Sequence, residues 1–339
     1  MLFWVNFFLF FTAISAYGSP SLTYPNTSLA TVPVAYFGGN TKYRGQDNIN
    51  MLAKMRIVMI EKWEGPCWAE CMKDSSSSSC QPTCNVENYI LDTFSRVKAV
   101  NPGVSTILYL NTLMDFPFYT LHGLFEAADA NTRDSITGDV ITIRNDGGME
   151  NITIYGFDTD AGVNLYIDAV KNFTRTKLVD GFFGDKWSKG AELNETTGEW
   201  QICNHECGTV SEHQAHRWNA GKAKVLAAVT EYVGNGPYFS YEPDFMGVGS
   251  NLNGYWKNDA LLFNPQGDPR KGIEDVKSHQ ANHSYTYISC TSDQPWSHDP
   301  DSSLSSQCSE DVLARFLLAV EEGTFLGLSC TKTAKKYKI

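Results

Sequence analysis

Short apolar runs along the chain alternate with segments in which apolar residues recur every third or fourth position. The first pattern is typical of buried strands and the second of amphipathic helices. We expect strands at residues 32–37, 56–61, 105–110, 151–157, 178–183, 238–241, 285–289 and 324–329. We expect helices at residues 48–55, 86–100, 161–173, 211–233 and 309–320. Because an open doubly wound sheet rarely contains so many strands in one alternation, the pattern predicts an α/β fold, a single (β/α)8 TIM-type barrel.

The first 18 residues predict a cleaved signal peptide. The apolar run at residues 2–14 is short for a membrane span, and Ala16 and Gly18 fit the small residues that precede cleavage before Ser19. A retained N-terminal anchor is the alternative.

The rest of the chain, residues 19–339, is expected to be one barrel domain of catalytic type, because it has no internal repeat and no long linker. Residues 331–339 are too few and too basic to form a last helix over the final strand. Either the barrel closes without that helix, or the sequence continues beyond Ile339.

Cysteine usage indicates an oxidising compartment. The nine cysteines are Cys67, Cys71, Cys80, Cys84, Cys203, Cys207, Cys290, Cys308 and Cys330. Most are expected to pair as disulfides in loop insertions, although the sequence leaves their connectivity open. Zinc binding is the alternative for the cluster at residues 67–84 and for Cys203 and Cys207, which flank His205.

Five N-x-[ST] sequons give a second indication of export. They begin at Asn26, Asn151, Asn172, Asn194 and Asn282, and each is a potential glycan acceptor in a eukaryotic secretory pathway. Together with the signal peptide and the cysteines, they predict a secreted glycoprotein. A vacuolar or lysosomal lumen also fits.

Composition excludes several classes of function. The 27 Lys and Arg against 38 Asp and Glu give a net charge of −11, which disfavours nucleic acid as a partner. The sequence lacks the G-x-S-x-G elbow of serine hydrolases, the phosphate-binding G-x-x-x-x-G-K-[ST] and the zinc-binding H-E-x-x-H. His213 and His216 are interpreted as part of an exposed polar face rather than as metal ligands. No cofactor, no metal and no stable membrane insertion are expected, and the chain is expected to be a monomer.

Acidic side chains follow most of the predicted strands. In a barrel of parallel strands, the residues just past the carboxyl ends converge on one mouth. The acids at these positions are Glu61, Glu64, Asp115, Asp158, Asp160, Asp185, Glu242 and Asp244. The aromatic residues beside them are Trp63, Trp187, Tyr241, Tyr255 and Trp256. The pattern predicts a mouth lined with carboxylates and aromatic rings.

Carboxylates among aromatic rings are typical of a site that cleaves glycosidic bonds. One carboxyl group must give a proton to the leaving oxygen, and a second must attack the sugar or activate water. The apolar faces of sugar rings stack on indole and phenol rings, whereas a phosphate ester would require Lys, Arg or a metal. A polysaccharide or oligosaccharide is therefore the expected substrate.

The strand at residues 178–185, LVDGFFGD, carries the most specific motif. Its D-G-x-x-x-D pattern resembles a strand of (β/α)8 glycoside-hydrolase-like families and of the endo-α-1,4-polygalactosaminidase family. The resemblance implies that Asp185 is the nucleophile or stabilising carboxylate, that the later strand-end Glu242 is the acid/base, and that Asp180 is structural. The chain departs from the pattern in its cysteine loop, in the insertion at residues 189–207 and in its final helix, so the substrate stays open.

Further residues are candidates for substrate binding, and each has an alternative role. Those that we expect to contact substrate are Glu61, Trp63, Asp115, Asp158, Trp187 and Tyr241. Glu61 could instead form an exposed salt bridge with Lys62 at the rim of the mouth. The aspartates could instead cap loops, and the tryptophans could instead cover the end of the barrel.

The sequence thus predicts a secreted glycoside hydrolase with two carboxylates, of retaining or inverting mechanism. Two alternatives remain: a catalytically inactive, lectin-like barrel that binds carbohydrate, and a cysteine-rich surface or matrix protein in which the barrel is only a scaffold.

Overall fold

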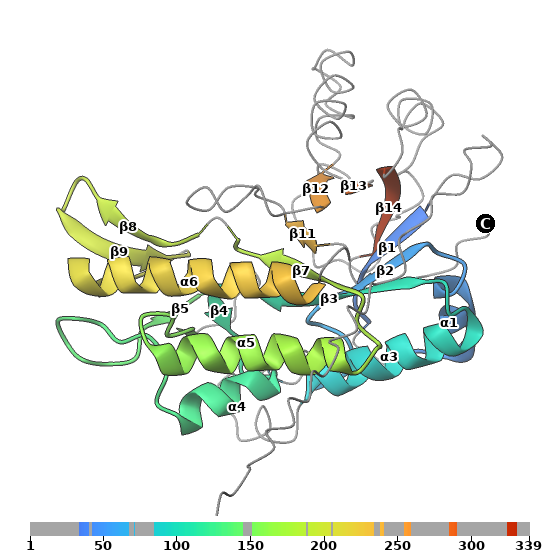
Figure 1. Cartoon of the computed structure of the whole chain (residues 1–339), viewed down its shortest axis with the longest axis horizontal. Coiled ribbons are helices and arrows are strands. Elements are labelled where there is room, and N and C mark those ends of the chain that lie inside the picture. Colours follow the sequence, from blue (N-terminus) through green and yellow to red (C-terminus); the bar gives the residue numbers. More distant parts are fainter. Residues whose placement is uncertain are drawn as a thin grey trace, which may run out of the picture.

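Eight parallel strands pair in a cyclic order and form a closed barrel (Figure 1). The structure is a computed structural model that describes residues 34–40, 43–67, 71, 85–144, 151–187, 189–204, 206–233, 238–240, 254–258, 285–289 and 324–330. The barrel strands are β1 (Val34–Gly38), β2 (Ile57–Ile60), β3 (Ser105–Asn111), β7 (Gly181–Asp185), β11 (Tyr238–Ser240), β12 (Gly254–Asn258), β13 (Tyr285–Ser289) and β14 (Thr324–Cys330). The cycle closes because β1 pairs in parallel with both β2 and β14.

Helices connect the first five barrel strands. The helices are α1 (Gln46–Leu52), α3 (Val86–Val100), α4 (Thr120–Ala127), α5 (Asp160–Arg175) and α6 (Glu212–Val233). One of α1, α3, α5 and α6 lies between each successive pair of barrel strands from β1 to β11. The predicted α/β class is therefore confirmed, whereas the predicted helix at 309–320 and the full alternation after β11 lie outside the described residues.

Local sequence accounts for these elements. In α3, the buried residues Val86, Ile90, Phe94 and Val97 recur at helical spacing, and the Asn85 side chain caps the helix by accepting from the Asn88 backbone N–H. All the residues of β2 and β3 are buried, which is typical of parallel strands covered on both faces.

Two small antiparallel sheets extend the loops beyond the carboxyl ends of the barrel strands. The first contains β4 (Met114–Asp115), β5 (Thr142–Ile143) and β6 (Ile152–Ile154), between β3 and α5. The second contains β8 (Ala191–Asn194), β9 (Glu199–Cys203) and β10 (Cys207–Val210), between β7 and α6. Both insertions therefore lie at the end of the barrel where the residues after the strands form the predicted mouth.

One predicted barrel strand is wrong. Within the predicted range 151–157, only Ile152–Ile154 form a strand, β6, and it pairs antiparallel with β4 and β5 instead of joining the barrel. The physical reason lies in its alternation, because Ile152 and Ile154 are buried and Thr153 is only partly buried, as in a half-covered antiparallel strand. The barrel instead contains β12, which has no apolar run and was not predicted.

A disulfide links Cys203 to Cys207, and Cys71 is also disulfide-bonded. The sulfurs of Cys203 and Cys207 are therefore not zinc-binding thiolates, which favours the disulfide interpretation of that pair. The predicted signal peptide lies outside the described residues. Within the described part of the chain, no helix combines the length and the hydropathy needed to cross a bilayer.

Candidate functional site

Asp185 is the last residue of β7 and lies beside Asn111, the last residue of β3. Two tyrosines fix the end of β3 from outside, because the Tyr119 hydroxyl donates to the Tyr109 carbonyl and the Tyr166 hydroxyl donates to the Asn111 carbonyl. The end of β3, beside which Asp185 lies, is therefore held by Tyr119 before α4 and by Tyr166 of α5.

Three donors hold the Asp185 carboxylate. The Tyr109 hydroxyl makes a short hydrogen bond to Oδ2, and the Asn111 side-chain amide donates to the same oxygen at 3.1 Å. The Lys186 backbone N–H donates to Oδ1 at 2.9 Å. Thr112 holds the Asp185 carbonyl through its backbone N–H and its hydroxyl, each at 2.9 Å. Both the plane and the position of the carboxylate are thereby fixed.

The hydrogen bonds of Asn111 determine the orientation of its amide. Its side-chain oxygen accepts from the backbone N–H groups of Leu113, at 2.9 Å, and Met114, at 2.6 Å. The amide nitrogen must then point toward Asp185 and Tyr109, whose hydroxyl oxygen lies 3.3 Å away.

Lys62 connects a second carboxylate to this group. Its Nζ lies 3.0 Å from Glu61 Oε2 and 3.1 Å from the Tyr109 hydroxyl. The ammonium also lies over the rings of Trp63, Tyr109 and Phe116, at 4.8, 4.3 and 5.6 Å from their centroids. Glu61, Lys62, Tyr109 and Asp185 thus form one chain of contacts across the ends of β2, β3 and β7, which we call the mouth network.

Burial controls the charge of Glu61. The side chain is only 3% exposed, and this burial raises the pKa of Glu61, with the negative charge of Asp185 adding to the rise and Lys62 opposing it. The predicted pairing of Glu61 with Lys62 is present, but as a buried ion pair rather than an exposed rim.

Trp63 and Trp187 differ in accessibility. Trp63 is half-buried beside Lys62 and packs close to Gly39, whereas Trp187 is completely buried. A ring with no exposed surface cannot stack on a sugar, so the structure argues against substrate contact by Trp187 and favours its alternative role in packing.

Asp115 lies in β4 of the side sheet and has no exposed surface. It accepts from Asn131 at 2.9 Å and contacts His122 Nδ1 at 2.9 Å. Burial lowers the pKa of His122, but Asp115 and Glu126 outweigh this effect and the net shift is upward. This buried cluster argues against the predicted substrate contact by Asp115.

The expectation that Asp158 follows a barrel strand is wrong, because it follows β6. It accepts a hydrogen bond from Gln214 of α6 at 3.0 Å, and burial raises the pKa of Asp158. Its contacts thus belong to the packing of α6 rather than to the mouth network.

Two other acids, Glu64 after β2 and Asp180 before β7, have structural contacts. Glu64 forms a two-pronged buried ion pair with Arg44, at 2.6 and 2.8 Å. Asp180 precedes β7 at the opposite end from Asp185, where it binds Lys98 at 2.6 Å and the Thr106 backbone N–H at 2.9 Å. Asp180 is therefore structural, in agreement with the prediction.

Glu242 and Tyr241 lie outside the described residues. Glu242 comes two residues after β11, and β11 pairs directly with β7. Within the described residues, no group of three or more His, Cys, Asp or Glu side chains is placed to hold a metal ion.

The sequence interpretation missed Tyr109 and Asn111 as members of the site. They lie on the same face of β3, two residues apart, at its carboxyl end. A polar residue and a tyrosine in this position, on a strand whose other residues are mostly apolar, are the signal that could have identified them.

No protein-family model matches the chain, and no curated protein matches it in sequence. Solved structures of glycoside hydrolases do match its fold. The GH31 dextranase FjDex31A of Flavobacterium johnsoniae is 10% identical, with a TM-score of 0.51, over 90% of this chain and 37% of the dextranase. A xylosidase from Aspergillus niger is 11% identical, with a TM-score of 0.51, over 90% of this chain and 45% of the xylosidase.

The chain therefore has a glycoside-hydrolase-like fold and spans less than half the length of these two enzymes. At this level of identity, the likeness concerns the fold alone. The resemblance to the endo-α-1,4-polygalactosaminidase family stays a prediction.

Proposed function

We propose that the protein is a secreted glycoside hydrolase that cleaves an extracellular polysaccharide with two carboxylates, Asp185 and Glu242. The observation that supports this most directly is the position of Asp185 at the carboxyl end of β7, where Tyr109, Asn111 and the Lys186 backbone N–H all donate to its carboxylate. The glycoside-hydrolase-like fold is consistent with the same chemistry.

Asp185 is the proposed nucleophile or stabilising carboxylate, and Glu242 the acid/base. In a retaining reaction, an Asp185 oxygen bonds to the anomeric carbon as the bond to the leaving oxygen breaks and Glu242 protonates that oxygen. Water, deprotonated by Glu242, then cleaves the glycosyl ester. In an inverting reaction, Asp185 instead accepts the proton of the attacking water. A carboxyl separation of about 5–5.5 Å indicates retention, and one of about 6.5–9.5 Å indicates inversion.

Lys62 and Trp63 are proposed to complete the substrate side of the mouth. The Lys62 ammonium lies between Glu61 and Tyr109, so it offsets the negative charge near Asp185. Trp63 is half-buried beside it and offers part of its ring to a sugar face.

Secretion is proposed from three features. The first is the N-terminal apolar run. The second is the use of cysteines in disulfides, namely Cys203 with Cys207 and, separately, Cys71. The third is the exposure of the sequon residues Asn151 and Asn172, which are accessible to glycan transfer.

The test is release of reducing ends from a broad polysaccharide panel at mildly acid pH. The wild type is compared with Asp185→Asn and with Asp168→Asn, a matched change at an exposed position on α5. Release by the wild type and by Asp168→Asn, but not by Asp185→Asn, supports the proposal. No release by any of them, together with binding on a glycan array, would favour the lectin-like alternative.

A further inference from the structure

An open groove lies between the second side sheet, the turn at residues 134–138 and the first residue of α6. Its volume is about 500 Å³, within the range of about 300–1,000 Å³ that is usual for small-molecule sites. The residues that line it include Ile136, Leu193, Glu199, Trp200, Val210 and Glu212. We call it the hairpin groove.

Strand register produces the apolar wall of the hairpin groove. Trp200 of β9 lies directly opposite Leu193 of β8 and opposite Val210 of β10, so the three side chains share one face of the sheet. Ile202, two residues after Trp200 on the same face, has no exposed surface. Toward the groove this face is open, because Leu193 is 48% exposed and Ile136, on the facing turn, is 73% exposed. Apolar surface is therefore left uncovered at a concave position.

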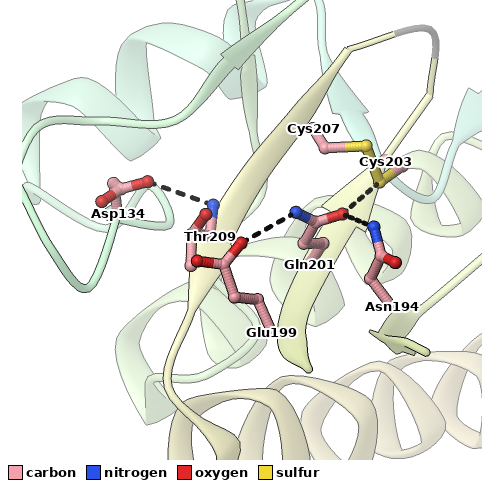
Figure 2. The surroundings of a disulfide bond; sticks show 7 residues. All are labelled: Asp134, Asn194, Glu199, Gln201, Cys203, Cys207 and Thr209. Carbon is pink, nitrogen blue, oxygen red and sulfur yellow. Dashed lines mark hydrogen bonds between the residues drawn. A yellow bond between two sulfur atoms is a disulfide. The ribbon is translucent and has the colours of Figure 1, made fainter. Parts of the chain in front are cut away.

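Hydrogen bonds of one carboxylate fix the facing turn. Asp134 accepts from the backbone N–H of Ile136 at 2.8 Å. It also accepts from the backbone N–H of Thr209 at 3.1 Å (Figure 2). The backbone N–H groups of Thr137, Ile136 and Thr209 together outweigh the effect of burial and lower the pKa of Asp134, so the carboxylate stays charged. The Ser135 N–H also donates to the Thr209 carbonyl at 2.9 Å. The turn that carries Ile136 is thus joined to β10.

The opposite end of the hairpin is closed by the disulfide between Cys203 and Cys207, which are paired across β9 and β10 (Figure 2). Trp200 is in turn packed against His216 of α6, with the ring centroids 5.1 Å apart. Because both walls are held before any ligand arrives, little conformational entropy is lost on binding.

Charge restricts the ligand that this groove accepts. Glu199 and Glu212 are exposed on its rim, and none of the described residues that line it carries a positive charge. Polyanions are therefore repelled. A sugar chain matches the two kinds of surface, because its C–H faces fit apolar and indole groups while its hydroxyls donate to carboxylates.

The position of the groove relates it to the proposed reaction. β8 begins six residues after Asp185, and Figure 1 shows β8 and β9 extending past the carboxyl end of β7 along the first turns of α6. We propose that the hairpin groove is a second saccharide-binding site that holds an uncharged polysaccharide chain on the same side of the barrel as the mouth. This inference rests on the proposed function for its ligand class.

The test is affinity electrophoresis through gels that contain dextran, xylan or, as a polyanion, polygalacturonate. Every protein carries Asp185→Asn, so that cleavage cannot alter the gel. At least one of the uncharged polymers is expected to retard this protein, and polygalacturonate is not. Adding Trp200→Ala is expected to weaken the apparent affinity at least about fivefold.

A second pair of variants distinguishes loss of binding from loss of folding. Ile136→Asp places a charge in the groove at a side chain that is already mostly exposed, so folding should be unaffected while retardation falls. Leu124→Asp, the same kind of change at a 47% exposed position on α4, should leave retardation unchanged. Full retardation of the Trp200→Ala and Ile136→Asp variants, or no retardation by either uncharged polymer, overturns the inference.

The two proposals fail separately. Wild-type release of reducing ends from the same polymers tests the mouth without reference to the groove. If the wild type cleaves a polymer and the groove variants are retarded as strongly as their parent, only the proposal about the hairpin groove is wrong. If retardation depends on Trp200 but the wild type cleaves none of the polymers, only the proposed glycoside hydrolase activity is wrong.

Discussion

The direction of a single hydroxyl proton decides how Asp185 is held. Lys62 and the Asn111 amide are donors only, and both point at the Tyr109 oxygen. The one proton of Tyr109 must therefore go to Asp185, its nearest acceptor. Burial, followed by the charges of Asp185 and Glu61, raises the pKa of Tyr109, so the hydroxyl keeps that proton.

Tyr109→Phe removes this proton and should lower kcat about 10- to 100-fold, because a hydrogen bond to a charged group contributes about 1.5–3 kcal/mol. KM should change little, since the hydroxyl acts on Asp185 rather than on bound sugar. Steady-state kinetics on the polymer found by the panel checks the prediction. Tyr232→Phe, at an exposed position on α6, is the matched control. An unchanged kcat in Tyr109→Phe would show that the mouth network does not position Asp185.

Some residues of the site can be predicted from the sequence and others cannot. Asp185 is predictable because it ends an apolar strand, and the structural role of Asp180 is what the D-G-x-x-x-D resemblance implies. Tyr109 is not predictable, because its acceptor lies 76 positions away in the sequence and is brought close only when β3 pairs with β7. The burial of Trp187 and Asp115 could not be predicted either, since it depends on insertions whose packing has no local signal.

At the scale of elements, a carboxylate on one helix caps another. The N-cap residue of α4, Tyr119, makes no side-chain cap, and Glu87 of α3 instead accepts from the Thr120 N–H at 2.8 Å. Burial raises the pKa of Glu87 to about 7, although these hydrogen bonds oppose the rise. The contact between the two helices therefore depends on pH.

The stabilising contribution of neutral Glu87 is fully present below its unfolded pKa of about 4.5 and is lost as pH rises through about 7. Glu87→Gln should remove this loss. From pH 4 to pH 8, the variant should gain up to about 3 kcal/mol relative to the wild type in the free energy of unfolding. Urea unfolding at several pH values measures the difference. Glu231→Gln, at an exposed site, should follow the wild type, and parallel curves for Glu87→Gln and the wild type would contradict the assignment.

Elements with strong periodicity were predictable and those with weak patterns were not. The bounds of α3 agree with its prediction at both ends, because capping and amphipathic spacing coincide there. The sequence of β6 is compatible with either kind of strand, so it also predicts a strand of the barrel. β12 was overlooked because GYWKN carries polar residues at its end and its pairing with β11 and β13 is the only mark of a strand.

At the scale of the whole molecule, a buried ion pair joins the first βα units of the barrel. Glu64, after β2, binds Arg44, before α1, and also accepts from Thr93 of α3 at 2.8 Å and from the Asn40 N–H at 2.8 Å. The Arg44 guanidinium also donates to the Tyr36 hydroxyl of β1 at 3.1 Å. The order of the eight strands depends on many such distant contacts, which no local pattern encodes.

Arg44→Met should destabilise the protein by about 3–5 kcal/mol, because it leaves the Glu64 charge buried without its cation. Arg175→Met, at an exposed position on α5, should change the free energy of unfolding by no more than about 1 kcal/mol. Urea unfolding of both variants provides the comparison. A loss of under about 1 kcal/mol in Arg44→Met would mean that this ion pair does not hold the barrel together.

The catalytic role of Asp185 is best tested by the turnover number of Asp185→Asn on the polysaccharide that the wild type cleaves. Asp168→Asn is measured beside it, and thermal unfolding verifies that both variants are folded. We expect Asp185→Asn to be folded and to have lost at least about 100-fold in kcat, with Asp168→Asn unchanged. A folded Asp185→Asn that turns over at the wild-type rate would show that Asp185 takes no part in the chemistry.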